Sequence, residues 1–241
     1  MTRGNRVVVP PVHLITDDAV LAHDEFDARM EALLALGGAQ VALHVRGAGT
    51  PGRRLQEIVE RAREVAGEGA RVIVNDRLDV ALAAGADGVQ LARRSLPLAA
   101  ARTVAPALPM GLSVHAVEDI AAARAAGARG PDWFVAGTIW PTASHPDRPG
   151  GGLDHLRAMV ESARAEVESA HVGVESAHAG VESARAGAAS APVIAIGGVT
   201  PERTVEARRA GAGGVAVLRG VWAAVDPVEA LSRYLSAWND P

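Results

Sequence analysis

The strongest constraint on the fold of this chain is a regular alternation of short apolar runs and longer helix-like stretches along its 241 residues. Eight runs rich in valine, isoleucine and leucine are predicted strands: 12–16, 40–45, 71–75, 88–91, 110–115, 133–139, 193–196 and 214–218. Helices are predicted at 25–36, 53–66, 77–84, 98–105, 117–126, 153–188, 201–210 and 227–238. Such alternation is typical of parallel βαβ units. Eight units predict a (β/α)8 TIM barrel formed by a single domain, 1–241.

Two glycine-containing loops near the C-terminal end favour this barrel over its competitor, an open doubly wound sheet. Gly197-Gly198 follows the seventh predicted strand, and Gly220 follows the eighth. In a parallel barrel these two loops, with a nearby helix N-terminus, form the usual phosphate site. Their backbone N–H groups can hold an anion without a lysine. We therefore expect phosphate binding by Gly197, Gly198, Leu218, Arg219 and Gly220, although a Gly-Gly pair is also typical of a simple tight turn.

Residues 160–187 interrupt the pattern with four tandem heptads that share the letters Val-Glu-Ser-Ala. Valine and alanine lie three apart, as at positions a and d of a heptad. The recurring glycines each oppose helix formation by roughly 1 kcal/mol. We interpret the repeat as an insertion in the sixth crossover that either lengthens a helix or leaves the barrel as an arm. Duplication of one residue explains His171 and His178 more simply than a metal site does.

Composition excludes several classes of function. The chain has no cysteine, which rules out disulfides, thiolate metal sites and cysteine nucleophiles. Its net charge of −4 argues against nucleic acid or an anionic membrane as a partner. No apolar run approaches the ~18 residues needed to span a bilayer, and residues 1–12 do not resemble a signal peptide. We expect a cytoplasmic protein that binds a small molecule, not a nucleic acid or a membrane.

Polar residues end each of the first six predicted strands, where the functional residues of a barrel lie. The main candidates are His44, Arg46, Asn75, Asp76, Ser113, Thr138 and Thr142, with His145 in the loop after the sixth strand. His44 and Arg46 alternate, so we expect both to face the same side of the second strand and to contact a ligand. Structural alternatives stay open for 75–77, which is also typical of a turn with a helix cap, for Asp17 or Asp18 as caps, and for His115.

Six stretches of the chain match the pattern of a known superfamily: 13–17 (His-Leu-Ile-Thr-Asp), 73–79, 85–91, 111–115, 137–142 and 195–200 (Ala-Ile-Gly-Gly-Val-Thr). In this order they resemble the small barrels of thiamine phosphate synthase and the thiazole tautomerase TenI. The resemblance runs from about residue 12 to the C-terminus and is interrupted only by the heptads. It implies a barrel of thiamine biosynthesis that binds a thiazole phosphate. Barrels of this superfamily often pair, so it also implies a homodimer.

One branch of the superfamily, the synthase, joins a pyrimidine diphosphate to a thiazole phosphate and releases pyrophosphate. It uses Mg²⁺ and cationic groups to stabilise the leaving group. Asp76 matches one metal-binding carboxylate of that branch. Other features differ: Gln-x-Arg-Glu-Lys is replaced by residues 44–48 (His-Val-Arg-Gly-Ala), His-Leu-Gly-Gln-x-Asp by 90–95 (Gln-Leu-Ala-Arg-Arg-Ser), and Thr-x-Thr-Lys by 142–145 (Thr-Ala-Ser-His). The synthase is therefore an alternative, with Asp76 as metal ligand and Arg93 or Arg94 replacing lost groups.

The other branch, the TenI-like tautomerase, transfers a proton within a thiazole carboxylate phosphate and needs neither pyrophosphate nor a metal. The chain fits this branch at 44–46 and at Gln90, but Thr138 stands where the branch has its acid/base histidine, and threonine is a poor base at neutral pH. This isomerase, without a cofactor, is the first expectation from the sequence. Its proton-transfer candidates are His44, Thr138 and His145, and its substrate contacts are Arg46, Asn75, Ser113 and Thr142. A non-catalytic protein that binds the thiazole phosphate, or regulates through it, is a further alternative.

Overall fold

The computed structural model describes residues 8–125, 129–142, 149–172 and 191–240. Within these residues the strands form a closed barrel in sequence order, and all neighbouring strands are parallel. The strands are β1 (Val12–Ile15), β2 (Val41–Val45), β3 (Arg71–Asn75), β4 (Gly88–Leu91), β5 (Met110–Val114), β6 (Trp133–Gly137), β7 (Val193–Ile196) and β8 (Gly214–Val217). The predicted (β/α)8 barrel is confirmed, because β1 pairs with β8 and an open sheet has no such pair.

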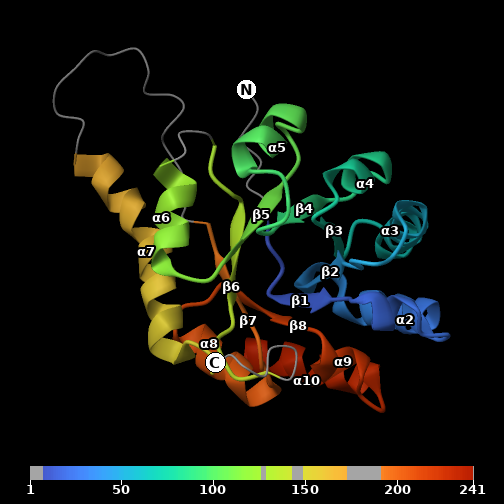
Figure 1. The fold of residues 1–241 in the computed structure, drawn as a ribbon. Coiled ribbons are helices and arrows are strands. Elements are labelled where there is room, and N and C mark those ends of the chain that lie inside the picture. The colour runs from blue at the N-terminus through green and yellow to red at the C-terminus, as the bar shows by residue number, and fades with distance from the viewer. Residues whose placement is uncertain (1–7, 126–128, 143–148, 173–190, 241) are drawn as a thin grey trace.

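Helices surround the barrel (Figure 1). They are α1 (Asp18–Leu21), α2 (Phe26–Gly37), α3 (Gly52–Ala66), α4 (Leu78–Ala83), α5 (Leu98–Val104), α6 (Val117–Ala125), α7 (Gly152–Val172), α8 (Pro201–Arg209), α9 (Arg219–Trp222) and α10 (Pro227–Asn239). Helix α10 packs against both α2 and α8, so the outer layer is continuous where β1 meets β8. None of the helices in the described part of the chain is long and apolar enough to cross a membrane.

Most predicted elements agree with the structure to within one or two residues at each end. The sixth strand is shorter than predicted and ends at Gly137. The sequence pattern does not predict α1, α9 or the 3₁₀ turn at Gly38–Gln40. Each of these has only three or four residues, which is too short for a periodic apolar pattern to show.

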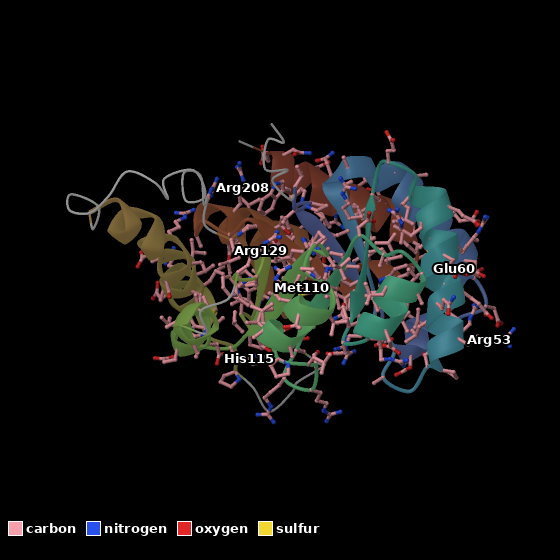
Figure 2. The ribbon with its side chains drawn as sticks, turned by 90° about the horizontal axis from the view of Figure 1, so that it is seen from above. Arg53, Glu60, Met110, His115, Arg129 and Arg208 are labelled. Carbon is pink, nitrogen blue, oxygen red and sulfur yellow. The ribbon has the colours of Figure 1, made fainter. Side chains whose placement is uncertain are left out.

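Two layers of buried side chains hold the barrel together, because the strands are buried on both faces as parallel strands usually are. The outer layer lies between strands and helices. The inner layer fills the barrel with Ile15, Ala42, Ile73, Trp133, Val135, Ile194 and Ala216. Gly111 makes room for the indole of Trp133, since a Cβ there would overlap the ring. Figure 2 shows Arg53 and Glu60 of α3 at the periphery, with Met110 among the packed side chains. A ligand must therefore bind at an end of the barrel.

The heptad repeat begins inside α7. Residues 160–172 of the repeat continue this helix, and Val160 and Ala163 are buried, as expected for positions a and d. The rest of the repeat, including His178, lies outside the described residues. The interpretation of 160–187 as an insertion therefore stays a prediction, and its first residues, up to 172, are helical.

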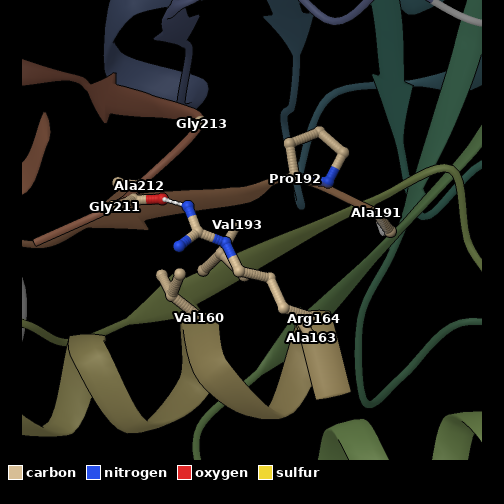
Figure 3. Close-up of a pocket in the computed structure, with 9 residues that line it drawn as sticks. All are labelled: Val160, Ala163, Arg164, Ala191, Pro192, Val193, Gly211, Ala212 and Gly213. Atoms are coloured by element: carbon tan, nitrogen blue, oxygen red, sulfur yellow. Dashed lines mark hydrogen bonds between the residues drawn. The ribbon is translucent and has the colours of Figure 1, made fainter. Parts of the chain in front are cut away.

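A pocket of about 200 Å³ lies where α7 meets the first residues of β7 and β8 (Figure 3). Arg164 of α7 projects into it and donates a hydrogen bond of 3.2 Å to the carbonyl oxygen of Gly211. The pocket is at the amino ends of the strands, opposite the predicted functional residues. It is also smaller than the ~300–1,000 Å³ of typical ligand sites. We therefore place the functional site at the other end of the barrel.

Candidate functional site

The carboxyl ends of the strands bring several predicted site residues to one end of the barrel. Asn75 is the last residue of β3, Ser113 lies near the end of β5, and Thr138 follows β6. These three side chains are partly exposed, and Arg46, just after β2, is exposed. Thr142 is also partly exposed, whereas His145 lies outside the described residues. The predicted substrate contacts Arg46, Asn75 and Ser113 thus share one end of the barrel.

A chain of buried polar groups runs from inside the barrel to this end. His13 Nε2 lies 2.8 Å from the carbonyl oxygen of Pro10, and His13 Nδ1 lies 2.8 Å from His44 Nε2. His44 Nδ1 is 3.0 Å from the side-chain amide of Asn75. Both imidazoles have an exposed fraction of 0%. Burial lowers the pKa of His44 to about 4 and, together with the adjacent His44, holds the pKa of His13 well below its usual range.

This environment changes the interpretation of His44. The sequence predicts it as a proton-transfer residue facing the ligand beside Arg46. In the structure His44 is enclosed and both ring nitrogens are engaged, whereas Arg46 is exposed. A general base needs a nitrogen within reach of the substrate and a pKa near the working pH. The geometry therefore favours a structural or positioning role for His44 over direct proton transfer.

A second polar chain positions Ser113. The indole N–H of Trp133 donates to Gln90 Oε1 at 2.7 Å, and Gln90 Nε2 donates to the hydroxyl oxygen of Ser113 at 3.0 Å. Because Ser113 accepts this bond, its own hydroxyl proton can be donated elsewhere, including to a ligand. Trp133 was not among the predicted site residues. Trp133 lies in an apolar run, and such a run does not indicate that the indole N–H holds the side-chain amide of Gln90.

Asp76 is held at the edge of the same end of the barrel. Its backbone is left-handed, with φ 64°, and its N–H donates to the carbonyl oxygen of Gln90 at 2.9 Å. Ser95 donates its hydroxyl to Asp76 Oδ1 at 2.6 Å. Ser95 stands where the synthase pattern has a second metal-binding aspartate. In the synthase pattern two carboxylates at these positions would share a cation. Here one of them is replaced by the neutral hydroxyl of Ser95, which donates to Asp76.

The described residues contain no cluster of three histidine or acidic side chains that could hold a metal ion. Mg²⁺, however, is commonly bound by one or two carboxylates together with substrate phosphates and water. Asp76 fits that arrangement as a single carboxylate. The residues therefore suit a Mg²⁺ ion that arrives with a diphosphate, and they do not form an all-protein metal cage.

The loop after β7 has the shape expected of an anion site. Gly197 and Gly198 have φ values of 97° and 63°, and a Cβ on Gly198 would lie 2.5 Å from the carbonyl oxygen of Pro141. Trp140 N–H donates to the carbonyl oxygen of Gly197 at 3.1 Å, which ties the β6 and β7 loops together. Thr200 then caps α8 by accepting from the backbone N–H of Arg203. Positions 197 and 198 therefore require glycine, because their φ values are positive and neighbouring atoms leave no room for a Cβ.

The loop after β8 leads directly into the short helix α9. Leu218 is its N-cap residue, and Arg219 and Gly220 are its first, exposed residues. The two glycine loops thus end in neighbouring helix N-termini, the arrangement that favours anions in parallel barrels. This geometry agrees with the predicted phosphate-binding set, which stays a prediction.

Several other polar residues have structural partners. Asp17 caps α1 by accepting from the backbone N–H of Val20 at 2.9 Å. His115 lies 2.5 Å from the carbonyl oxygen of Gly137, which supports its structural interpretation. Asp18 accepts from the hydroxyl of Thr50 at 2.6 Å and from the backbone of Gly49; these bonds lower the pKa of its carboxyl group. They join the loop after β1 to the loop after β2.

The fold and this end of the barrel together define a (β/α)8 barrel with glycine loops after β7 and β8. A family profile described as thiamine monophosphate synthase matches residues 12–221. The chain therefore belongs to the thiamine monophosphate synthase (TMP-TENI) family, as the sequence resemblance predicts.

Curated relatives agree with this assignment. A thiamine-phosphate synthase from Pyrococcus furiosus is 34% identical over 193 residues, which are 80% of this chain and 79% of that protein. A thiamine-phosphate synthase from Caldivirga maquilingensis is 31% identical over 229 residues, covering 95% of this chain and 97% of that protein. Both relatives are named as synthases, which confirms the prediction of an enzyme. They do not single out the TenI-like branch.

Solved structures give the same result. The structure of a thiamine phosphate pyrophosphorylase from Pyrococcus furiosus is similar, with a TM-score of 0.73 at 29% identity over 95% of this chain and 96% of that one. A 3-hexulose-6-phosphate synthase has a TM-score of 0.62 at 18% identity, covering 94% of this chain and 99% of that one. The second likeness shows the fold alone.

Proposed function

We propose that this protein is a thiamine-phosphate synthase that joins hydroxymethylpyrimidine diphosphate to hydroxyethylthiazole phosphate and releases pyrophosphate. The observation that carries the proposal is the likeness to synthases at 34% and 31% identity over 80% and 95% of the chain. The tautomerase, the first expectation from the sequence, has no comparable support. The proposed substrates are both phosphorylated small molecules. We also expect a cytoplasmic homodimer, from composition and from the family resemblance.

The chemistry of the site supports displacement better than proton transfer. In the proposed reaction the thiazole nitrogen attacks the methylene carbon of the pyrimidine, and the carbon–oxygen bond to the diphosphate breaks. The electron pair of that bond leaves with pyrophosphate, so no general base is needed at carbon. A tautomerase does need one, yet His44 is buried with both nitrogens engaged, and Thr138 is a poor base.

Charged residues at the ends of β2, β3 and β4 suit a diphosphate leaving group. Arg46, Arg93 and Arg94 are exposed there, and cationic groups stabilise the charge that develops on a leaving phosphate. Asp76 would hold Mg²⁺ jointly with the diphosphate oxygens, and the ion would supply further charge neutralisation. The glycine loops at 197–198 and 218–220 would hold the thiazole phosphate, with Asn75, Ser113 and Thr142 near the rings.

One observation favours a second candidate, the metal-independent tautomerase. The hydroxyl of Ser95 bonds to Asp76 at 2.6 Å where the synthase pattern has an aspartate. A site that has lost this carboxylate has less charge with which to attract Mg²⁺. If the protein is a tautomerase, its base must lie elsewhere, and His145 is the proposed candidate.

A single assay separates these functions. The purified protein is incubated with both synthase substrates, with and without Mg²⁺, and thiamine phosphate and pyrophosphate are quantified. A parallel reaction with the thiazole carboxylate phosphate follows its isomerisation by proton NMR. Mg²⁺-dependent formation of both synthase products supports the proposal. Isomerisation that is insensitive to EDTA, without condensation, would replace it with the tautomerase, and binding without turnover would indicate a non-catalytic binder.

Variants make the assay more specific. Asp76→Asn should reduce condensation at least tenfold, because the only candidate metal carboxylate of the described site residues loses its charge. Asp27→Asn, on an exposed position of α2, is the matched control and should leave the rate unchanged. Equal rates for both variants would remove Asp76 from the mechanism.

A further inference from the structure

The chain from Pro10 through His13 and His44 to Asn75 fixes the direction of its own hydrogen bonds. A carbonyl oxygen can only accept, so His13 must carry a proton on Nε2, which lies 2.8 Å from the oxygen of Pro10. In a neutral imidazole the other nitrogen is then an acceptor. His13 Nδ1 must therefore accept from the N–H at His44 Nε2, 2.8 Å away. The second nitrogen of a neutral His44, Nδ1, is left as an acceptor.

This order of donors leaves a conflict at Asn75. In the structure the amide oxygen of Asn75, which is also an acceptor, lies 3.0 Å from His44 Nδ1. Two acceptors at that distance repel, so either His44 carries a second proton or the amide is turned by 180°. Burial disfavours the charged imidazolium, and the pKa of about 4 leaves His44 neutral at pH 7. The turned amide, with its NH₂ group donating to His44 Nδ1, gives each ring nitrogen of His13 and His44 a suitable partner.

The turned amide has a consequence for the ligand. Asn75 ends β3 and is partly exposed, whereas His13 and His44 are fully buried. With its NH₂ group directed to His44, its carbonyl oxygen is directed away from the imidazole. A hydrogen-bond acceptor held in this way favours a ligand that presents an N–H or O–H donor.

We propose that His13 and His44 are positioning residues that hold the amide of Asn75 with its oxygen available to accept a hydrogen bond from an N–H group of the substrate. The ligand half of this inference rests on the proposed function, because an aminopyrimidine carries such a donor in its exocyclic amine. The positioning half stands on the hydrogen-bond chain alone.

The first test is ¹⁵N NMR of the histidine side chains in the ligand-free protein at pH 7, assigned with single-histidine variants. It reports which ring nitrogen carries the proton. We expect the proton on Nε2 of both His13 and His44. A proton on Nδ1 of His44, alone or with one on Nε2, would overturn the proposal. This readout does not depend on turnover, so it holds whether or not the protein is a synthase.

The second test changes the anchor of the chain. His13→Leu removes the acceptor for His44 Nε2–H, so His44 should shift its proton to Nδ1 and Asn75 should turn its oxygen inward. We expect KM for the aminopyrimidine diphosphate to rise about tenfold, the value of one hydrogen bond, with kcat within about twofold. His13→Asn restores an acceptor near the position of Nδ1, and it should recover both the Nε2–H form and most of the KM.

The outcomes are distinguishable. If His13→Leu folds, by circular dichroism and thermal melting, and His44 keeps its proton on Nε2, the positioning inference is wrong. If the proton of His44 moves to Nδ1 but KM and the calorimetric affinity for the pyrimidine diphosphate do not change, Asn75 does not bind the substrate through its oxygen. The ligand half of the proposal is then wrong. If the wild-type protein neither binds nor converts the pyrimidine, the proposed function and the ligand half fail together, while the ¹⁵N result still decides the positioning half.

Discussion

Arg203 donates a hydrogen bond of 2.6 Å to the carbonyl oxygen of Gly198, so the third residue of α8 holds the glycine loop that precedes the helix. Its guanidinium also lies 5.6 Å from the centre of the Trp140 ring, a cation–π distance. One side chain thereby joins α8, the β7 loop and the β6 loop. The β7 loop, which should hold phosphate together with the β8 loop, is therefore fixed before any ligand arrives.

This arrangement predicts that Arg203→Met weakens phosphate binding without large loss of fold, because methionine keeps most of the apolar stem but cannot hold Gly198. We expect affinity for hydroxyethylthiazole phosphate to fall about threefold to tenfold, as for one lost hydrogen bond. Isothermal titration calorimetry measures it. Arg209→Met, at an exposed position of the same helix, is the control. Unchanged affinity in Arg203→Met would show that the loop holds its shape unaided.

Ser95→Asp should strengthen the response to Mg²⁺. The substitution places a second carboxylate beside Asp76, where the hydroxyl of Ser95 now donates. Two carboxylates at this distance repel each other and attract a divalent cation. We expect the Mg²⁺ concentration for half-maximal condensation to fall, with Ser95→Asn as the uncharged control. A variant that needs as much Mg²⁺ as the wild type would place the ion away from Asp76.

The two buried histidines should make stability depend on pH between about 4 and 6.5. Burial lowers the pKa of His44 from 6.5 to about 4, so in that interval the unfolded chain binds a proton that the folded chain does not. Stability is then complete above pH 6.5 and falls as the pH drops towards 4, by on the order of 3 kcal/mol for His44. His13, whose pKa is also lowered, adds to the same trend.

Urea unfolding at pH 7.5, 6, 5 and 4.5 measures this dependence. The double variant His13→Leu/His44→Leu should show a shallower decline than the wild type over the same interval. His23→Leu, an exposed histidine, should leave the slope unchanged. Parallel curves for the wild type and the double variant would mean that neither buried imidazole is the source of the acid sensitivity.

Gly111→Ala should destabilise the inner layer of the barrel. A Cβ at this position would overlap the Trp133 indole and the Gln90 amide, so the chain that positions Ser113 must shift. Overpacking of this kind typically costs about 1–3 kcal/mol. Gly130→Ala is the matched control, because a Cβ there has no heavy atom within 4 Å. Chemical denaturation measures both, and equal stabilities would show that Trp133 can move at little cost.

Asp132 offers a comparison of a buried and an exposed ion pair on one carboxylate. Arg102 pairs with Asp132 at 2.7 Å and has a side-chain exposure of 7%, whereas Arg129 pairs at 2.8 Å and has 56%. Arg102→Met leaves a buried carboxylate without its main partner and should cost about 3–5 kcal/mol. Arg129→Met should cost at most about 1 kcal/mol. Similar losses of unfolding free energy in urea would contradict this ranking.

The sequence predicts this fold well because each strand and each longer helix of the barrel has its own local pattern of apolar residues. Apolar runs such as 71–75 and 193–196 are bounded by glycine or polar turns, and their spacing alone implies eight parallel units. Alternation along β2 predicts that His44 faces the inside of the barrel with Arg46, and the structure places His44 there, bonded to His13. The short helix α9 has only four residues, so it shows no periodic apolar pattern by which the sequence could predict it.

The site was harder to predict, because it depends on which polar groups meet across the barrel. The alternation of the second strand predicts which side His44 faces. Only the structure shows that His13 of the neighbouring strand is hydrogen-bonded to it. Likewise, the replacement of an aspartate by Ser95 is visible in the sequence, whereas the bond from Ser95 to Asp76 is not. Contacts between strands far apart in the chain are set by register and tilt, which local patterns do not encode.

The pairing of β1 with β8, in which Val12 lies opposite Val215, also has a kinetic consequence. These residues come from opposite ends of the described chain, so their contact closes a very long loop. The entropic cost of closing that loop opposes folding before the contact can stabilise the barrel. Until that seam forms, β1 and β8 are open edges with unpaired backbone groups, which are templates for association between chains. Refolding at high protein concentration should therefore favour aggregates joined through these two strands, and dilution should favour barrels that close within one chain.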